Sequence, residues 1–179
     1  MSKTVDILAT AIRSAVNGEP FDNVVNKLKE LDEVKVKVWR EHESVKLPTY
    51  AKEGDACMDI YVHDIEMKSD GRVVYHTGLH FKLPEDYEME IRPRSSNTKT
   101  VAVMQNAPGT LDEGYTGELM IVHRNVDFPT IANPQYKIGD RCAQILVRRR
   151  ENIVWDEVTN IEDLGTTERG AGGFGSSGK

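Results

Sequence analysis

The segment Asn106-Ala-Pro-Gly-Thr-Leu-Asp-Glu-Gly-Tyr-Thr-Gly-Glu118 decides how the rest of the chain is interpreted. Turn-forming residues punctuate it at Pro108-Gly109 and Glu113-Gly114, and strand-like apolar residues lie on both sides. This pattern predicts a tight β-hairpin. Its glycines would let backbone N–H and C=O groups approach a flat polar ligand closely, with Asp112 and Tyr115 at fixed offsets. The same pattern also fits an ordinary loop with turn residues.

Four further motifs flank this segment in sequence order. They are Asp55-Ala-Cys-Met-Asp59, Pro93-Arg-Ser-Ser96, Gly139-Asp-Arg-Cys-Ala-Gln144 and Arg169-Gly-Ala-Gly-Gly-Phe-Gly-Ser-Ser-Gly178. With the hairpin segment, they resemble the five ordered motifs of the trimeric dUTP pyrophosphatases (dUTPases), and the resemblance covers residues 34–179. Five motifs in the right order are far more specific than any one of them.

The resemblance implies a homotrimer that hydrolyses dUTP to dUMP and pyrophosphate, with active sites shared between subunits. It assigns Asp112 as the general base for a water that attacks the α-phosphorus, and Asp59 as the residue that holds water on Mg²⁺. Tyr115 would stack under the deoxyribose. The other substrate-binding residues that it implies are Asn106, Gly109 and Leu111 for uracil, and Arg94, Ser95, Ser96, Arg141, Gln144, Arg169, Phe174, Gly175, Ser176 and Ser177.

Two alternative functions stay within the same fold. The first is a dCTP deaminase, whose family has a glutamate in the strand after the hairpin. Alignment on Gly117 and Asn125 without gaps places Val122 there, and valine cannot transfer protons. The second is a non-catalytic nucleotide sensor, against which the retained Asp112 and Asp59 argue.

Composition limits the possible partners. The net charge of −6 disfavours nucleic-acid binding, and no apolar run has membrane-spanning length. The N-terminus lacks the pattern of a secretory signal, which favours the cytoplasm, or the host cytoplasm for a viral protein. Cys57 and Cys142 are expected to be small buried residues in a reducing compartment. His76 and His80 lack partners at metal-ligand spacing, so no metal site is expected there.

The pattern of apolar residues divides the chain into three parts. Residues 1–33 predict a helical hairpin that either covers apolar surface, the favoured interpretation, or docks a protein partner. Residues 34–165 predict an all-β, jelly-roll-like sandwich, with strands at Val34–Val38 (half-buried) and Tyr87–Ile91. Residues 166–179 are Gly-rich and predict a flexible arm that closes over an active site.

Overall fold

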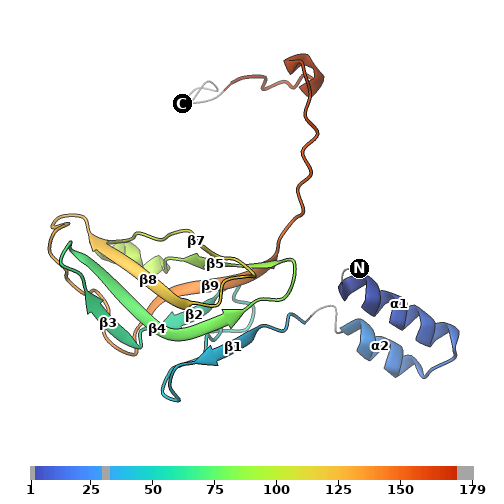
Figure 1. Cartoon of the computed structure of the whole chain (residues 1–179), viewed down its shortest axis with the longest axis horizontal. Helices are drawn as coiled ribbons and strands as arrows, with labels where there is room; N and C mark the ends of the chain where they lie inside the picture. The colour runs from blue at the N-terminus through green and yellow to red at the C-terminus, as the bar shows by residue number, and fades with distance from the viewer. Residues whose placement is uncertain (1–2, 30–32, 173–179) are drawn as a thin grey trace.

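In a computed structural model that describes residues 3–29 and 33–172, the chain folds into two antiparallel β-sheets and a pair of helices (Figure 1). The elements are α1 (Lys3–Val16), α2 (Phe21–Lys29), β1 (Lys37–Arg40), β2 (Met58–Tyr61), β3 (Asp64–Met67), β4 (Arg72–Lys82), β5 (Tyr87–Arg92), the 3-10 helix η1 (Ser95–Lys99), β6 (Ala102–Met104), β7 (Gly109–Leu111), β8 (Glu118–Asn125), β9 (Arg141–Arg149) and the 3-10 helix η2 (Ile161–Leu164). The predicted all-β fold is confirmed.

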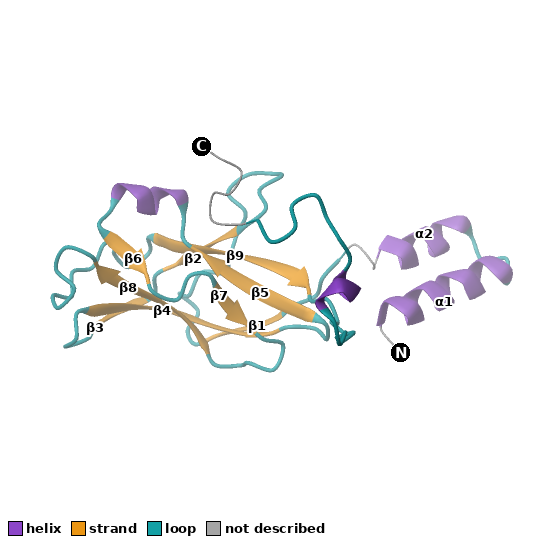
Figure 2. Ribbon diagram, turned by 90° about the horizontal axis from the view of Figure 1, so that it is seen from above, coloured by secondary structure: helices purple, strands orange, loops and turns teal. Residues whose placement is uncertain are grey.

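The two sheets face each other across one hydrophobic core (Figure 2). The first has the strand order β1-β4-β8-β6, with β3 also paired to β4, and the second has the order β2-β9-β5-β7. Strands such as β8 alternate buried and more exposed residues, as expected for sheets packed face to face. Residues at most 1% exposed come from both sheets: Tyr75, Leu79 and Ile121 from the first, and Ile60, Met89 and Ile145 from the second.

The expected tight hairpin at 106–118 is only partly correct. The flanking strands β6 and β8 do pair antiparallel, with Met104 opposite His123. Between them, however, the chain crosses to the second sheet, where β7 pairs with β5. Leu111 is buried under that sheet, and its burial accounts for the detour. The segment therefore bridges the two sheets, and we refer to residues 106–118 as the bridging hairpin.

Two other expectations need correction. The strand predicted at Val34–Val38 begins at Lys37 instead, and Val34 and Val38 are 42% and 40% exposed. The reason is its position, because β1 is an edge strand that pairs only with β4. Cys142 is fully buried in β9 as expected, whereas Cys57 lies in the loop before β2 and is only partly buried.

The helices α1 and α2 form the expected helical hairpin and pack on each other, burying Ala11 and Ser14 (Figure 1). Their apolar stripe is not covered, since Ile12, Val16 and Phe21 are 62%, 80% and 78% exposed. The favoured interpretation, that the stripe covers apolar surface, stays a prediction. Among the described residues, no helix has the length and apolar character needed to cross a bilayer.

Candidate active site

A carboxylate clamped by two arginines forms the first part of the site. Asp59 lies in β2 opposite Gln144 of β9 and is 8% exposed. Its Oδ1 accepts a hydrogen bond from Arg94 Nε at 3.0 Å, and its Oδ2 accepts one from Arg141 Nη1 at 3.0 Å. The clamp joins three of the predicted motifs in one chain. Because the buried carboxylate is paired on both oxygens, it also fixes where the two guanidinium groups lie.

The Arg94 motif continues this cluster at the end of β5. Arg94 Nη1 donates to Ser96 Oγ at 3.2 Å and to the backbone carbonyl of Arg141 at 3.3 Å. Ser95 begins η1 and is exposed. Gln144 Nε2 makes a long contact of 3.5 Å with the Pro93 carbonyl. These cationic and polar groups together suit phosphate oxygens, and we call Asp59, Arg94, Ser95, Ser96, Arg141 and Gln144 the arginine cluster.

The bridging hairpin forms the second part of the site around a cavity of about 320 Å³. Asp112 and Tyr115 line it, together with Asn106, Gly109 and Leu111 and with β5 and β8 residues. Asp112 is exposed to solvent there, so a water molecule can reach its carboxylate. Tyr115 Oη donates to the Glu118 carbonyl at 3.1 Å, which fixes the ring at the cavity.

Asn106 supports the cavity wall with both ends of its amide. Its Nδ2 donates to the Met120 carbonyl at 2.9 Å, and its Oδ1 accepts from the Val122 N–H at 3.0 Å. The side chain thereby continues the ladder that β6 makes with β8. Its predicted contact with uracil would have to share or replace these two bonds, so in this structure Asn106 acts on the backbone of β8.

Asp112 and the arginine cluster lie at opposite ends of β5 in one chain, although the cavity extends along β5 as far as Ile91. The register pairs Ile91 with Gly109 and Met89 with Leu111, so Asp112 lies beside the start of β5. Arg94 follows the other end of the same strand. At about 3.3 Å per residue, the six residues between these positions separate the arginine cluster from Asp112 by roughly 20 Å. A single chain therefore does not bring all the predicted site residues together.

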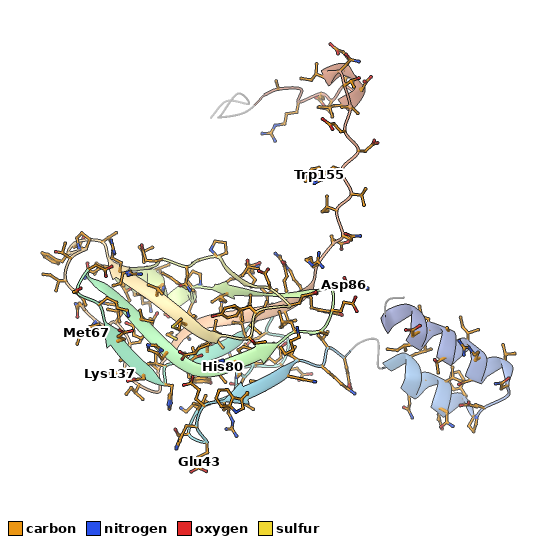
Figure 3. The ribbon with its side chains drawn as sticks, viewed as in Figure 1. Glu43, Met67, His80, Asp86, Lys137 and Trp155 are labelled. Carbon is orange, nitrogen blue, oxygen red and sulfur yellow. The ribbon has the colours of Figure 1, made fainter. Side chains whose placement is uncertain are left out.

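The arm residues are remote from both parts. After β9 the chain runs out in extended form to η2, and Trp155, 89% exposed, lies on this stretch away from the sheets (Figure 3). Within the described residues, Arg169 Nε donates to the nearby Gly172 carbonyl, at 2.9 Å. The predicted arm residues Phe174, Gly175, Ser176 and Ser177 lie outside the described residues.

Sequence reasoning missed the side chains of β4 that hold the bridging hairpin. Lys82 Nζ donates to the Glu113 carbonyl at 2.8 Å, and His80 Nδ1 lies 2.9 Å from the Thr116 carbonyl. Glu118, which lines the cavity, is bonded to His76. The available signal was the even spacing of residues 76, 80 and 82, which places them on one face of a strand. No group of three or more metal-ligating side chains occurs within 3–29 and 33–172.

Comparisons with known proteins agree with these motifs. A family model described as dUTPase matches residues 43–178. The deoxyuridine 5'-triphosphate nucleotidohydrolase of Fusobacterium nucleatum is 40% identical over 155 residues, which cover 83% of this chain and 100% of that protein. The corresponding protein of Wolinella succinogenes is 36% identical over 154 residues, which cover 85% and 99%.

Solved structures show the same fold. A Staphylococcus bacteriophage 80alpha dUTPase with dUpNHpp has a TM-score of 0.64 at 24% identity, covering 81% of this chain and 99% of that one. A variant of the dUTPase from phage phi11 of S. aureus, described with the coordination of a structural Mg(II) ion, has a TM-score of 0.57 at 21% identity, covering 72% and 99%.

Proposed function

This chain belongs to the dUTPase family and is a dUTP diphosphatase, and we propose which role each of its site residues has in the hydrolysis of dUTP. We infer that a water attacks the α-phosphorus of dUTP with Asp112 as the general base. The observation that carries this assignment is the place of Asp112, which is exposed and lines the 320 Å³ cavity beside Tyr115. A base positioned in this way contributes on the order of 100- to 10,000-fold to the rate.

The cavity of the bridging hairpin is proposed to hold the nucleoside. Tyr115 would stack under the deoxyribose, which leaves no room for a 2′-hydroxyl. Uracil would lie against the hairpin backbone at Gly109 and Leu111, both of which line the cavity. Asn106, whose amide is bonded to β8, would keep the facing wall in place. A close-fitting wall rejects the thymine methyl group, and an unpaired polar group disfavours cytosine.

The arginine cluster is proposed to hold the phosphates. Arg94 and Arg141 are preorganised by Asp59, and the hydroxyls of Ser95 and Ser96 and the amide of Gln144 lie next to them in sequence or on the neighbouring strand. Guanidinium groups bind phosphate oxygens as paired donors. Preorganised donors of this kind stabilise the charge that develops as pyrophosphate leaves.

Mg²⁺ is the proposed cofactor. A precedent comes from the similar dUTPase of phage phi11, whose solved structure is described with a structural Mg(II) ion. The donor set fits a metal carried mainly by the triphosphate, since Mg²⁺ keeps several waters and needs few carboxylates. Asp59 already accepts one arginine bond on each oxygen, so its remaining lone pairs would accept hydrogen bonds from the waters of the ion. When bound, Mg²⁺ neutralises charge on the phosphates.

A homotrimer is proposed because one chain leaves its own site incomplete. Asp112 and the arginine cluster lie at opposite ends of β5. The stretch after β9 carries Val154 and Trp155, which are 83% and 89% exposed and would be covered by another subunit. A second and a third copy would bring Arg94 of one chain and Arg169 of another to Asp112. We propose the division into residues 1–33, 34–165 and 166–179 on the same basis, with the arm reaching a neighbouring site.

The two alternatives are not favoured. In the structure Val122 lies in β8 and lines the cavity, where it offers no group that could transfer a proton for deamination. A purely regulatory nucleotide binder would not need an exposed Asp112 beside the sugar pocket.

Hydrolysis in ¹⁸O-labelled water tests the proposal. We expect pyrophosphate release from dUTP, little from dCTP or dTTP, and all of the ¹⁸O in dUMP, because attack at the α-phosphorus leaves the new oxygen there. Label in pyrophosphate would place the attack on the β-phosphorus and remove Asp112 from the proposed role.

A further inference from the structure

The strand β4 carries an irregularity where it meets the bridging hairpin. The register between β4 and β8 shifts between His76 and His80, and Gly78 between them has φ +65°. A Cβ at Gly78 would stand 2.7 Å from Val45 Cγ2, so a glycine is needed at this position. His76 lies on one side of this bulge and contacts Glu118, and His80 lies on the other side and contacts Thr116.

His76 holds Glu118, which lines the cavity. Glu118 Oε2 lies 2.8 Å from His76 Nδ1, and Glu118 Oε1 accepts a hydrogen bond from the Gly78 N–H at 2.9 Å. The other ring nitrogen of His76, Nε2, lies 3.5 Å from Glu66 Oε2 on β3. Both neighbours of the ring are carboxylates, which accept hydrogen bonds when ionised and donate none.

His80 holds the hairpin backbone in the same way, and Figure 3 shows it on β4 close to β1. Its Nδ1 lies 2.9 Å from the Thr116 carbonyl, and its Nε2 lies 3.0 Å from Glu41 Oε1. The ring of Trp39 packs against it with centroids 4.9 Å apart. Again both partners are acceptors, and a neutral imidazole has only one N–H to donate. Each histidine can therefore make both of its bonds only as the doubly protonated imidazolium.

We propose that His76 and His80 are positioning residues for dUTP binding: as imidazolium ions they tie Glu118 and Thr116 of the bridging hairpin to β3 and to the end of β1, and so hold Tyr115 in place. The inference rests on the proposed role of the cavity as the nucleoside site. Thr116 and Glu118 lie on either side of Gly117, over which Tyr115 packs, so movement of this segment moves the ring. Loss of one proton from either ring breaks one of its two bonds and loosens the hairpin.

The charged groups around each ring favour the protonated form. Burial alone lowers the pKa of His76, but the hydrogen bonds and charges of Glu118 and Glu66 outweigh it and raise the pKa above its usual value. Asp64 lies opposite His76 on β3, and Lys68 pairs with Glu66.

For His80, the bond to Glu41 raises the pKa most, followed by the Thr116 carbonyl and the charge of Glu118. Lys82, on the same face of β4, is engaged by the Glu113 carbonyl. Both rings therefore keep their second proton to a higher pH than an ordinary histidine, and the hairpin is tied down at pH values below these raised pKa values.

The test compares binding of dUpNHpp, with Mg²⁺ present, to the full-length protein and to His76→Gln and His80→Gln. A glutamine amide has both of its N–H donors on one nitrogen and an acceptor oxygen at its other end, so it cannot present a donor nitrogen to each of the two acceptors as an imidazolium does. The quantity of interest is the ratio of the Kd of each variant to that of the unmodified protein, because protonation of the nucleotide itself cancels in the ratio. We expect a ratio of about ten near pH 6, falling toward one near pH 9, the size expected for one charge-assisted hydrogen bond. A purely structural role would give a ratio that does not change with pH, and this result would overturn the proposal.

His42→Gln is the matched control. Within the described residues the His42 ring bonds to the neighbouring Ser44 and to no residue of the bridging hairpin, so its ratio should stay near one at every pH. A second measurement is independent of nucleotide. In ligand-free protein, the NMR signals of the His76 and His80 rings should titrate above the usual histidine value, and the Tyr115 ring signals should shift with the same midpoints. If the Tyr115 ring signals do not shift with the midpoint of either histidine, the proposal is wrong. Failure of the unmodified protein to bind dUpNHpp at any pH would instead count against the proposed nucleoside site.

Discussion

The hydroxyl of Tyr115 lies directly over Gly117: a Cβ added at Gly117 would stand 2.4 Å from Tyr115 Oη and 2.6 Å from its Cζ. The same hydroxyl is bonded to the Glu118 carbonyl. We therefore expect Gly117→Ala to push the ring out of place and to raise the KM for dUTP about tenfold or more, the effect of a steric change costing roughly 1–3 kcal/mol. Because Tyr115 is 44% exposed, the Tm should change little.

A Tyr115→Ala background supplies the control for this steric argument. Without the ring, the three nearest atoms that the added methyl group would meet are gone, so Gly117→Ala should have almost no further effect on KM. Equal effects of Gly117→Ala with and without Tyr115 would show that the glycine matters for another reason.

The proposed base is tested by Asp112→Asn. The amide has the shape of the carboxylate but cannot accept a proton from water, so kcat should fall by on the order of 100- to 10,000-fold. Because Asp112 is exposed and the amide keeps its shape, the Kd for dUpNHpp should stay close to that of the unmodified protein. Single-turnover rates with dUTP and binding of the analogue measure the two separately. A near-normal kcat would assign the base to another residue.

The proposed arm is tested by deletion of residues 166–179. The described part of the arm makes only local bonds, such as Arg169 Nε to the Gly172 carbonyl, so the fold should survive the deletion. Turnover should fall by orders of magnitude, since a closing arm excludes water and brings a cation to the phosphates. Circular dichroism and sedimentation check the fold and the assembly. Arg169→Gln separates the charge from the rest of the arm, and normal turnover by the truncated chain would refute the proposed arm.

The helical hairpin is predicted to be dispensable for chemistry. A chain that begins near Val34 should hydrolyse dUTP at close to the full-length rate, because α1 and α2 pack on each other and contribute no residue to the cavity. Deletion also removes the exposed Ile12, Val16 and Phe21, so solubility should be kept or improved. Rates and solubility of the two chains measured side by side decide this. A stable but inactive shorter chain would place the extension in the site.

The local sequence pattern predicted where a strand forms, but it did not predict which other strand that strand pairs with. The alternation at Tyr87–Ile91 correctly predicted β5, whose Met89 and Ile91 are buried. The same reasoning predicted one tight hairpin at 106–118. In the structure, however, β7 pairs with β5 in the second sheet and not with β8. A strand's neighbour is set by contacts distant in sequence, here by burial of Leu111, which the residues of the segment alone do not reveal.

The site shows a similar division. The five motifs predicted Asp59, Arg94 and Arg141 as functional residues, but not that one carboxylate would hold both guanidinium groups. Nor did they reveal His76 and His80, whose role depends on Glu118 and Thr116 some forty residues away in sequence. Hydrogen bonds between distant strands follow from register, and register is a property of the folded chain.

Stability in acid provides the last test, through a histidine that takes no part in the proposed reaction. His123 is 1% exposed in the core, packed edge-on against Tyr75 and Tyr136, and neither ring nitrogen has a hydrogen-bond partner among the described residues. Burial lowers its pKa to about 4, from the ordinary value of about 6.5. Between these two values the unfolded chain binds a proton that the folded chain does not. The free energy of unfolding must therefore fall as the pH falls through this range, by roughly 3 kcal/mol in total at about 1.4 kcal/mol per pH unit.

Replacement of His123 by Phe isolates this effect. Phenylalanine is a somewhat larger ring that leaves no buried nitrogen unpaired, so the stability of the variant relative to the unmodified protein should rise as the pH falls from 7 to 5. His76 and His80, with raised pKa values, act in the opposite direction and lose stabilisation as the pH rises. They are common to both proteins and cancel in the difference. Urea unfolding of both chains at one protein concentration gives that difference directly. If it is the same at both pH values, His123 is protonated in the folded state, and a water or another polar partner must reach its ring.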